Sequence, residues 1–323
     1  MDKKLLVAKP VSSELEKFNT YYKDSIFSDN LRIRTIIDHM MKSDGKKIRP
    51  ILLLLAAKAC GEINEVTYAS AITIELLHTA SLIHDDVVDE SDTRRGKPSL
   101  NAVFDNKMAI LVGDYFLSTA LMKGVLTGNI NIISDISSLG RALAEGELTQ
   151  LSLVRELVLD EVEYFEVIRK KTASLMSVCM KIGAVSTGGT DKEIELFQQL
   201  GEYLGICFQL RDDIFDYFEA NVGKPTGNDI REGKVTLPLL HALNVAPSEE
   251  RDAMLNIISS KDFSNENVVE LMNFAKLHGG IDYAYSKIES YREKIAVLIE
   301  KVEKEDIRHA LYAAIDYIVE RIY

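Results

Sequence analysis

The chain has 323 residues, of which 46% are hydrophobic, and its formal net charge is −12. This apolar content is enough for a large buried core. An acidic surface repels nucleic-acid phosphates and anionic lipid headgroups, so nucleic acid is excluded as an expected partner and electrostatic docking on a membrane is disfavoured. An anionic ligand would therefore need metal ions or a few placed cations.

The N-terminus and the cysteines indicate the compartment. Residues 1–18 lack the apolar core and cleavage site of a signal peptide. The strongest apolar run, Ile51 to Ala57, is too short to span a bilayer. Cys60, Cys179 and Cys207 are odd in number and lie in apolar segments, which is typical of buried, reduced thiols. We therefore expect a cytoplasmic protein with no transmembrane segment.

Apolar residues recur at helical spacing along most of the chain. One predicted helix has an apolar face made of Ile72, Leu76, Thr79, Ile83 and Val87. A later predicted helix has an apolar face made of Leu196, Leu200, Tyr203, Leu204, Cys207, Leu210 and Ile214. Thr190, followed three residues later by Glu193, has the form of a capping box and predicts the start of this second helix.

Glycine, proline and asparagine separate helix-sized segments. These breaks fall near residues 44–45, 61, 95–98, 124–129, 188–189, 223–227, 246–247 and 279–280. The sequence has no Ser/Gly-rich linker and no low-complexity tract. We therefore predict an all-α fold in which residues 1–323 form a single domain, a helical bundle.

Two Asp-Asp-x-x-Asp motifs stand near the ends of the two predicted helices: Asp85, Asp86 and Asp89, and Asp212, Asp213 and Asp216. Residues four apart share one face of a helix, so the outer aspartates of each motif project together. Crowded carboxylates repel each other, and a hard cation such as Mg²⁺ relieves that repulsion. A solvated charged helix face is the alternative, but both motifs lie in apolar segments. The pair therefore predicts one magnesium site for a diphosphate substrate.

Other short motifs accompany the aspartates in order between about residues 45 and 240. They are Gly45-Lys46-Lys47-Ile48-Arg49-Pro50, His78, Arg94-Arg95-Gly96, Lys171-Thr172, Gln209 and the segment GKPTGNDIREGKVTLPLL. With these motifs the chain resembles the all-trans isoprenyl diphosphate synthases, the polyprenyl synthetase family. The resemblance implies the isoprenoid synthase type I fold, an all-helical bundle around a deep central cavity, and a homodimer.

The resemblance also implies that three Mg²⁺ ions lie between the two motifs and bind the diphosphate of an allylic substrate. Asp85, Asp89 and Asp212 would be direct ligands. The further or water-mediated ligands would be Asp86, Asp213 and Asp216.

The remaining motif residues would bind the substrates, by the same resemblance. The allylic diphosphate would contact Arg94, Lys171 and Lys234, with Lys224 close behind them. Isopentenyl diphosphate would bind without metal through Lys46, Arg49, His78 and Arg95. The residues expected to act directly in catalysis are Lys171, Thr172, Gln209 and Lys224. Taken singly, these could be surface cations, a core histidine or loop residues, but their joint occurrence favours the functional interpretation.

The implied reaction is a Mg²⁺-dependent head-to-tail (1′-4) condensation. The allylic diphosphate ionises, isopentenyl diphosphate attacks the cation, and the released diphosphate accepts the proton. Dipoles of Thr172 and Gln209 would stabilise the carbocation in a dry, apolar cavity. A class I terpene cyclase and a non-catalytic subunit of a heteromeric synthase are alternatives. Both tend to lack motifs that this chain keeps.

The residues before Asp85 bear on product length. One helical turn rises about 5.4 Å, close to one extended isoprene unit. Ser81 and Ala80, four and five residues before Asp85, are small, whereas short-chain relatives commonly have an aromatic residue there; Leu77 lies one turn further. We predict a hexaprenyl to decaprenyl product made from a farnesyl-type primer, with quinone side chains as the natural use and transient membrane contact during product release. The alternative is a short-chain farnesyl or geranylgeranyl diphosphate synthase.

Overall fold

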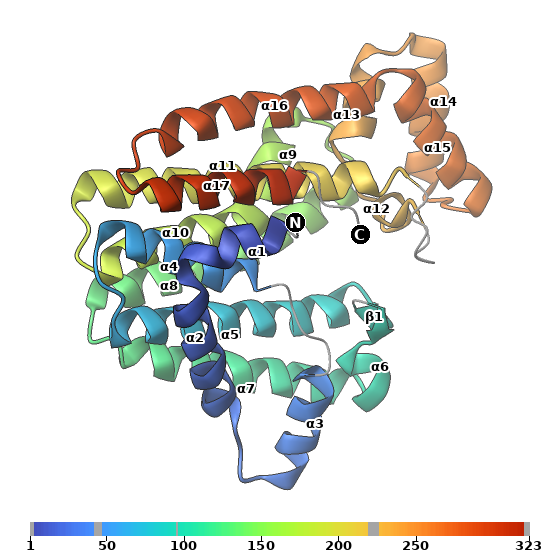
Figure 1. Ribbon diagram of the computed structural model, residues 1–323. Coiled ribbons are helices and arrows are strands. Elements are labelled where there is room, and N and C mark those ends of the chain that lie inside the picture. Colours follow the sequence, from blue (N-terminus) through green and yellow to red (C-terminus); the bar gives the residue numbers. More distant parts are fainter. Residues whose placement is uncertain (1–2, 42–46, 95, 219–225, 320–323) are drawn as a thin grey trace. The chain divides into compact units, whose positions relative to one another are not determined.

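The structure is a computed structural model that describes residues 3–41, 47–94, 96–218 and 226–319. Within these residues the only strands are β1 (Thr93–Arg94) and β2 (Lys97–Pro98), which pair antiparallel. All other regular elements are helices (Figure 1). The predicted all-α fold is confirmed.

The chain falls into two compact units, which are described separately. The first consists of Met1–Gly140, Leu175–Gly201 and Val302–Ala310, and the second of Arg141–Ser174, Glu202–Lys301 and Leu311–Tyr323. Most unit boundaries fall within helices, so α8, α10, α11 and α17 contribute residues to both units. The single domain expected from the sequence stays a prediction.

The first unit is organised around α5 (Glu65–Val88). Its other elements are α1 (Lys3–Ala8), the 3₁₀ turn η1 (Lys9–Val11), α2 (Ser12–Ile26), α3 (Leu31–Met41), α4 (Ile48–Cys60), α6 (Leu100–Phe104), α7 (Asn106–Val125), the start of α8 (Ile130–Glu156), most of α10 (Ser174–Ser186) and the start of α11 (Asp191–Phe215). α5 packs against α7, α4 and α2, and Figure 1 shows α5 and α7 side by side. The Asn64 side chain caps α5 by accepting hydrogen bonds from the Val66 and Thr67 amides at 2.9 and 3.2 Å. The helix ends at Val88 with Asp89 as its C-cap, so the first Asp motif lies at its C-terminal end.

By length and composition alone, α5 and α7 are each apolar enough to cross a membrane. In the most apolar stretch of α5, 67% of the residues are buried within the protein, compared with 33% in α7. Core helices of globular proteins pass the same test. The exposed apolar residues of α7 include Leu111, Leu121, Met122 and Val125.

Helix α10 approaches the α4 backbone at Gly183. A Cβ atom at this position would lie 2.3 Å from the Leu53 carbonyl oxygen and 3.0 Å from Ala56 Cβ. We expect Gly183→Ala to lower the free energy of unfolding by about 2 kcal/mol, because the backbone must move apart. Gly140→Ala is the matched control: its Cβ would lie 4.0 Å from the nearest side-chain atom, and alanine favours a helix by up to about 1 kcal/mol. Urea denaturation measures the free energy of unfolding of both variants. A Gly183→Ala protein as stable as the Gly140→Ala protein would contradict the close packing of α10 against α4.

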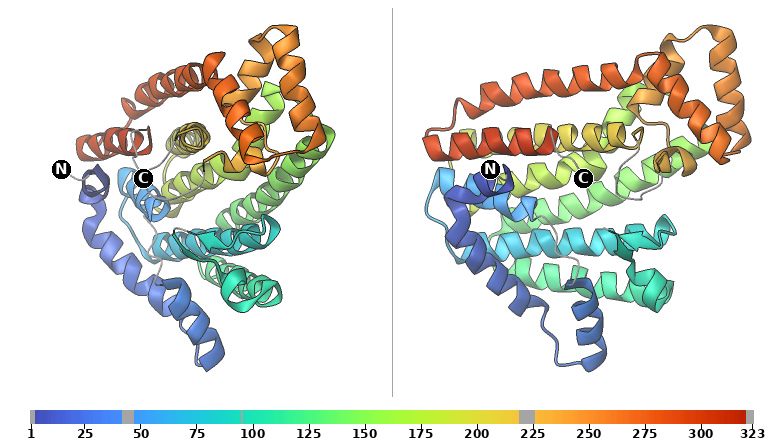
Figure 2. Two further views of the ribbon diagram at one scale, coloured as in Figure 1. Left: turned by 90° about the vertical axis from the view of Figure 1, so that its right-hand side faces the viewer. Right: turned by 45° about the vertical axis from the view of Figure 1, so that its right-hand side comes forward.

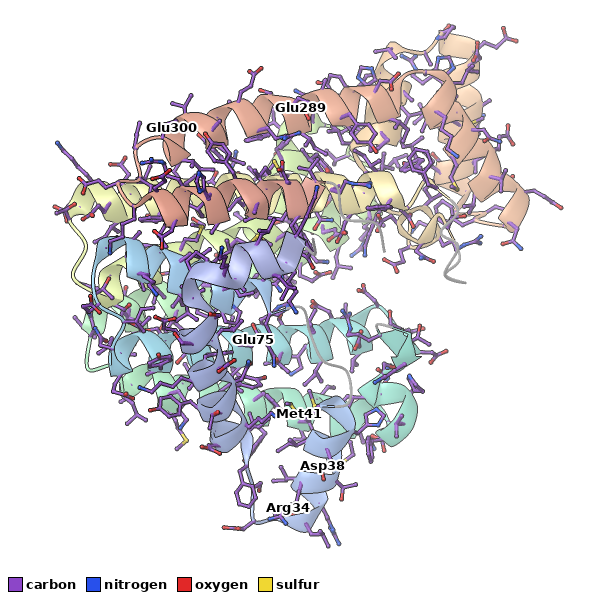
Figure 3. The ribbon with its side chains drawn as sticks, in the orientation of Figure 1. Arg34, Asp38, Met41, Glu75, Glu289 and Glu300 are labelled. Carbon is purple, nitrogen blue, oxygen red and sulfur yellow. The ribbon has the colours of Figure 1, made fainter. Side chains whose placement is uncertain are left out.

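The second unit has its core around α13 (Leu237–Val245). Its other elements are the end of α8, α9 (Glu161–Ile168), the π-helical turn η2 (Arg169–Ala173), the end of α11, α12 (Asn228–Arg231), α14 (Ser248–Ser260), α15 (Asn265–Leu277), α16 (Gly280–Ile299) and most of α17 (Glu305–Val319). Leu239 and Leu243 of α13 are buried with Leu271 and Met272 of α15. Both views in Figure 2 show the orange helices α14 and α15 close together. Glu300, labelled in Figure 3, accepts a 2.7 Å hydrogen bond from the Tyr312 hydroxyl, which links α16 to α17.

The predicted start of α11 is confirmed, and the predicted burial is confirmed for two of the three cysteines but not for Cys60. The Thr190 amide donates to Glu193 Oε2 at 2.7 Å, the Glu193 amide donates to Thr190 Oγ1 at 3.4 Å, and α11 begins at the next residue, Asp191. The three cysteines are unbridged; Cys179 and Cys207 are buried, and Cys60 is half-buried. Burial raises the pKa of all three thiols, to about 12 for Cys60 and Cys207.

Candidate functional site

In the first Asp motif, the three carboxylates differ in their surroundings. Asp86 is 4% exposed, and its Oδ1 lies 2.6 Å from both Nε and Nη2 of Arg94. Arg94 is the last residue of β1, the strand that follows α5 in the chain. Burial raises the pKa of Asp86, Arg94 opposes that shift, and the Asp89 charge adds to it. Asp85 and Asp89 are half-buried. Asp86 is therefore paired with a cation and is more buried than the other two aspartates of its motif.

A cavity of about 140 Å³ lies beside this motif in the first unit. Asp86, Arg94 and the buried His78 line it together. Met41 of α3 and Glu75 of α5, both labelled in Figure 3, also line it. Three residues predicted from the sequence thus share one cavity. Arg49 lies half-buried in the first turn of α4, and Lys46 and Arg95 lie outside the described residues.

The residues predicted to control product length lie on α5 before the motif. Ala80 is 3% exposed and Leu77 is also buried, whereas Ser81 is half-buried. The Ser81 hydroxyl donates to the His78 carbonyl oxygen at 2.9 Å. None of these three residues lines the cavity that contains His78.

The end of α11 carries the second Asp motif. Asp216 receives backbone hydrogen bonds on both carboxylate oxygens, from the Asn228 amide on Oδ1 and the Asp229 amide on Oδ2, each at 2.9 Å. Its carbonyl oxygen accepts the Gly227 amide, also at 2.9 Å. Asp216 therefore fixes the start of α12 to the end of α11. Asp212 is half-buried.

The predicted residues Thr172, Gln209 and Asp213 are joined in one chain of hydrogen bonds. Thr172 Oγ1 donates to Gln209 Oε1 at 2.7 Å, and Gln209 Nε2 donates to Asp213 Oδ1 at 2.7 Å. The Tyr164 hydroxyl donates to Asp213 Oδ2 at 2.5 Å. Burial of Asp213, which is 2% exposed, raises its pKa to about 7; the hydrogen bonds from Tyr164 and Gln209 lower it, and the charges of Asp212 and Asp216 add to the rise.

Lys171 and Thr172 lie in the π-helical turn, a feature that is frequent at functional sites. Gly205 of α11 faces this turn, because a Cβ there would lie only 2.5 Å from Ala173 Cα. Lys171 Nζ lies 2.5 Å from Glu147 Oε2 and donates to Gln150 Oε1 at 2.9 Å. A diphosphate bound by Lys171 would therefore compete with the Glu147 carboxylate.

A second cavity, also of about 140 Å³, contains Lys171, Thr172, Gln209, Asp213 and Lys234. Its other walls are largely apolar side chains from the end of α8 and from α9. The Lys234 ammonium pairs with Glu232. Five of the predicted residues thus lie in one cavity of the second unit, while Lys224 lies outside the described residues.

Among the described residues, no group of three or more His, Cys, Asp or Glu side chains is arranged to hold a metal ion by itself. Magnesium usually binds through one or two carboxylates and completes its shell with water and substrate phosphate oxygens. Asp86 is paired with Arg94, and Asp213 accepts two hydrogen bonds. Asp216 accepts two backbone hydrogen bonds. The expected direct ligands are the three remaining aspartates of the motifs, Asp85, Asp89 and Asp212, and their carboxylate oxygens fit a hard cation.

Four residues of the site were missed by the sequence interpretation. Tyr164 contacts Asp213, Glu147 and Gln150 contact Lys171, and the Asp229 amide contacts Asp216. Burial raises the pKa of Asp229, and the charges of Asp213 and Asp216 add to the rise. The available signals were weak: Tyr164 lies about two helical turns before Thr172, and Glu147 and Gln150 are spaced to share one helix face.

Known proteins resemble this chain over nearly its whole length. The family model "Polyprenyl synthetase" matches residues 30–274, which include both Asp motifs. The octaprenyl diphosphate synthase of Haemophilus influenzae is 34% identical over 320 residues, 98% of this chain and 97% of that protein. A geranylgeranyl pyrophosphate synthase structure from Bacteroides thetaiotaomicron is 41% identical with a TM-score of 0.87, covering 99% of this chain and 100% of that one. A polyprenyl synthase from Caulobacter crescentus, complexed with calcium and isoprenyl diphosphate, is 30% identical with a TM-score of 0.93, covering 99% and 98%.

Proposed function

Because the chain belongs to the polyprenyl synthetase family, we propose that it is a prenyltransferase that condenses isopentenyl diphosphate head to tail with an allylic diphosphate. The predicted family and the transferase class are confirmed. The observation that carries the reaction is the hydrogen-bonded set Thr172, Gln209 and Asp213, which shares one cavity with Lys171 and Lys234. That cavity combines cations for a diphosphate with oriented dipoles and apolar walls.

In this proposal the cations bind the two diphosphates. Lys171 and Lys234 bind the allylic diphosphate together with Arg94 and Lys224. The Lys171 ammonium leaves its ion pair with Glu147 and contacts phosphate oxygens instead when the substrate binds. Its positive charge then lies at the leaving group. The site for isopentenyl diphosphate consists of Lys46, Arg49, His78 and Arg95. The cavity shared by His78 and Arg94 supports their placement at neighbouring sites.

Metal binding by three of the motif aspartates is the second part of the proposal. Asp85, Asp89 and Asp212 hold Mg²⁺, with three ions at full occupancy. The bound ions supply neutralisation of the departing diphosphate. Asp86 and Asp213 orient Arg94 and Gln209, with which they interact.

The dipoles of the second cavity then act on the carbocation. The Thr172 hydroxyl donates a hydrogen bond to Gln209 Oε1. The negative partial charges of both oxygens then lie where positive charge develops. The apolar walls keep water away from the cation. The proton lost from the condensed product goes to the released diphosphate.

We further propose a medium- or long-chain product and a farnesyl-type primer. The name of the Haemophilus relative specifies an octaprenyl product, and that of the Bacteroides relative a geranylgeranyl product. The small side chains of Ala80 and Ser81 support the longer product, because neither blocks the helix face that leads back from Asp85.

The exposed apolar side chains of α7 support a homodimer. Leu111, Leu121, Met122 and Val125 would face water in a monomer, and contiguous apolar patches typically mark interfaces. We propose that a second copy covers them and that the enzyme works in the cytoplasm, with transient membrane contact during product release. Sedimentation equilibrium of the purified chain tests the dimer, and a monomer at micromolar concentration would contradict it.

The decisive assay combines purified protein, radiolabelled isopentenyl diphosphate, farnesyl diphosphate and MgCl₂. We expect label in prenyl products longer than farnesyl, and loss of that label when EDTA removes the metal. No incorporation would contradict the proposed function. Conversion of farnesyl diphosphate to a hydrocarbon without isopentenyl diphosphate would instead identify a terpene cyclase.

A further inference from the structure

Tyr164 is a buried residue that lines the second cavity. It has no role in the proposed reaction. Its side chain is 8% exposed and lines this cavity with Thr172, Gln209 and Asp213. The hydroxyl lies 2.5 Å from Asp213 Oδ2. Tyr164 belongs to α9 and Asp213 to α11, so this contact joins two helices of the second unit.

The direction of each hydrogen bond around Asp213 follows from its partners. The Tyr164 hydroxyl donates to Asp213 Oδ2 and the Gln209 amide nitrogen donates to Asp213 Oδ1, since an amide nitrogen can only donate. The Gln209 nitrogen then faces Asp213, and its carbonyl oxygen faces Thr172. The Thr172 hydroxyl in turn donates to that oxygen. The orientation of the Gln209 amide therefore depends on where the Asp213 carboxylate points.

Asp213 has two oxygens, and Gln209 contacts only one of them. Without a donor at Oδ2, the carboxylate could rotate about its bond to Cβ and offer either oxygen to Gln209. The Tyr164 hydroxyl holds Oδ2 in place, and its ring is fixed by an edge-on contact with Phe165 at 5.3 Å between centroids.

We propose that Tyr164 is a positioning residue for prenyl transfer: it holds the Asp213 carboxylate so that the Gln209 amide and the Thr172 hydroxyl present their oxygens to the carbocation. Asp213 is thereby assigned to positioning rather than to direct metal binding. This inference rests on the proposed function, since it concerns the same cavity. It predicts an effect on the chemical step and not on diphosphate binding.

The test is Tyr164→Phe, which removes the hydroxyl and keeps the ring and its contact with Phe165. We expect kcat to fall about 10- to 100-fold, as when a partner that orients a catalytic group is lost, while KM for both diphosphates stays unchanged. Tyr283→Phe is the matched control. The Tyr283 hydroxyl also donates to a carboxylate of the second unit, Glu161 at 2.8 Å, but Tyr283 does not line the cavity. Its loss should leave kcat unchanged.

A double-mutant cycle separates positioning from general damage. If Tyr164 acts through Gln209, Tyr164→Phe should lower kcat in the wild-type background but have no further effect in a Gln209→Ala background. Equal losses in both backgrounds would overturn the inference, and so would an unchanged kcat of the single variant. An inactive wild-type enzyme would overturn the proposed function together with this inference. An active wild-type enzyme with an unchanged kcat in Tyr164→Phe would overturn only the positioning role of Tyr164. Circular dichroism melting checks that the variants fold. If Tyr164→Phe does not fold, Tyr164→His takes its place in the test. Its ring N–H can still donate to Asp213, so this variant should keep part of the wild-type kcat.

Discussion

Asp85→Asn is expected to lower kcat/KM by about 10³-fold or more. The amide has nearly the same shape as the carboxylate but loses the charge that attracts Mg²⁺, and metal-assisted neutralisation of a leaving group contributes several kcal/mol to the transition state. Asp85 lies half-buried in the last turn of α5 and is not the aspartate that pairs with Arg94. Steady-state kinetics with both diphosphates at a series of Mg²⁺ concentrations measure the effect, and the apparent Mg²⁺ requirement should rise.

Asp24→Asn is the matched control for this substitution. Asp24 lies on the exposed side of α2. Its substitution removes the same negative charge from the first unit as Asp85→Asn does. Its kcat/KM should equal that of the wild-type enzyme. Near-wild-type activity of Asp85→Asn would show that Asp85 is not a metal ligand, and a similar loss in both variants would point to the general charge of the protein instead.

The sequence predicted those parts of the fold that depend on local patterns. Helical periodicity predicted the all-α fold, and the Thr190–Glu193 capping box predicted where α11 begins. Both depend on residues within a few positions of each other. The π-helical turn at Arg169–Ala173 could not be predicted, because it adjoins Gly205, more than 30 residues later in the chain.

The site shows the same division. Its motif residues could be found from the sequence, and Thr172, Gln209 and Asp213 do lie together. Their partners could not, because Tyr164 is 49 residues before Asp213 and no periodicity connects them. The competition of Glu147 for Lys171 is likewise a contact between α8 and the π-helical turn. Such contacts are set by packing.

The two small residues before Asp85 look equivalent in the sequence, but the structure separates them. Ala80 is 3% exposed, so a larger side chain there would overpack the first unit and cost about 1–3 kcal/mol of stability. Ser81 is half-buried, and its hydroxyl donates to the His78 carbonyl oxygen within the same helix turn. Ser81 is therefore the position at which bulk can be added with little effect on folding.

Ser81→Phe is expected to shorten the main product by several isoprene units, to farnesyl or geranylgeranyl length. Ser81 lies four residues before Asp85 on the same helix face, about one turn or 5.4 Å away, close to the length of one isoprene unit. A benzyl side chain there would stop a tail that leaves the diphosphate along α5. Chromatography of the dephosphorylated radiolabelled products measures their lengths.

Ser81→Ala isolates the effect of bulk, because it removes the hydroxyl and adds no volume. Its product lengths should match those of the wild-type enzyme. A Ser81→Phe enzyme that keeps its activity and its product lengths would mean that the tail does not follow this face of α5. A shortened ladder with an unchanged rate of the first condensation would instead place the barrier beyond the reacting carbons. The tail would then run from Asp85 past Ser81, and product length would be decided on α5, the helix that also carries the first Asp motif.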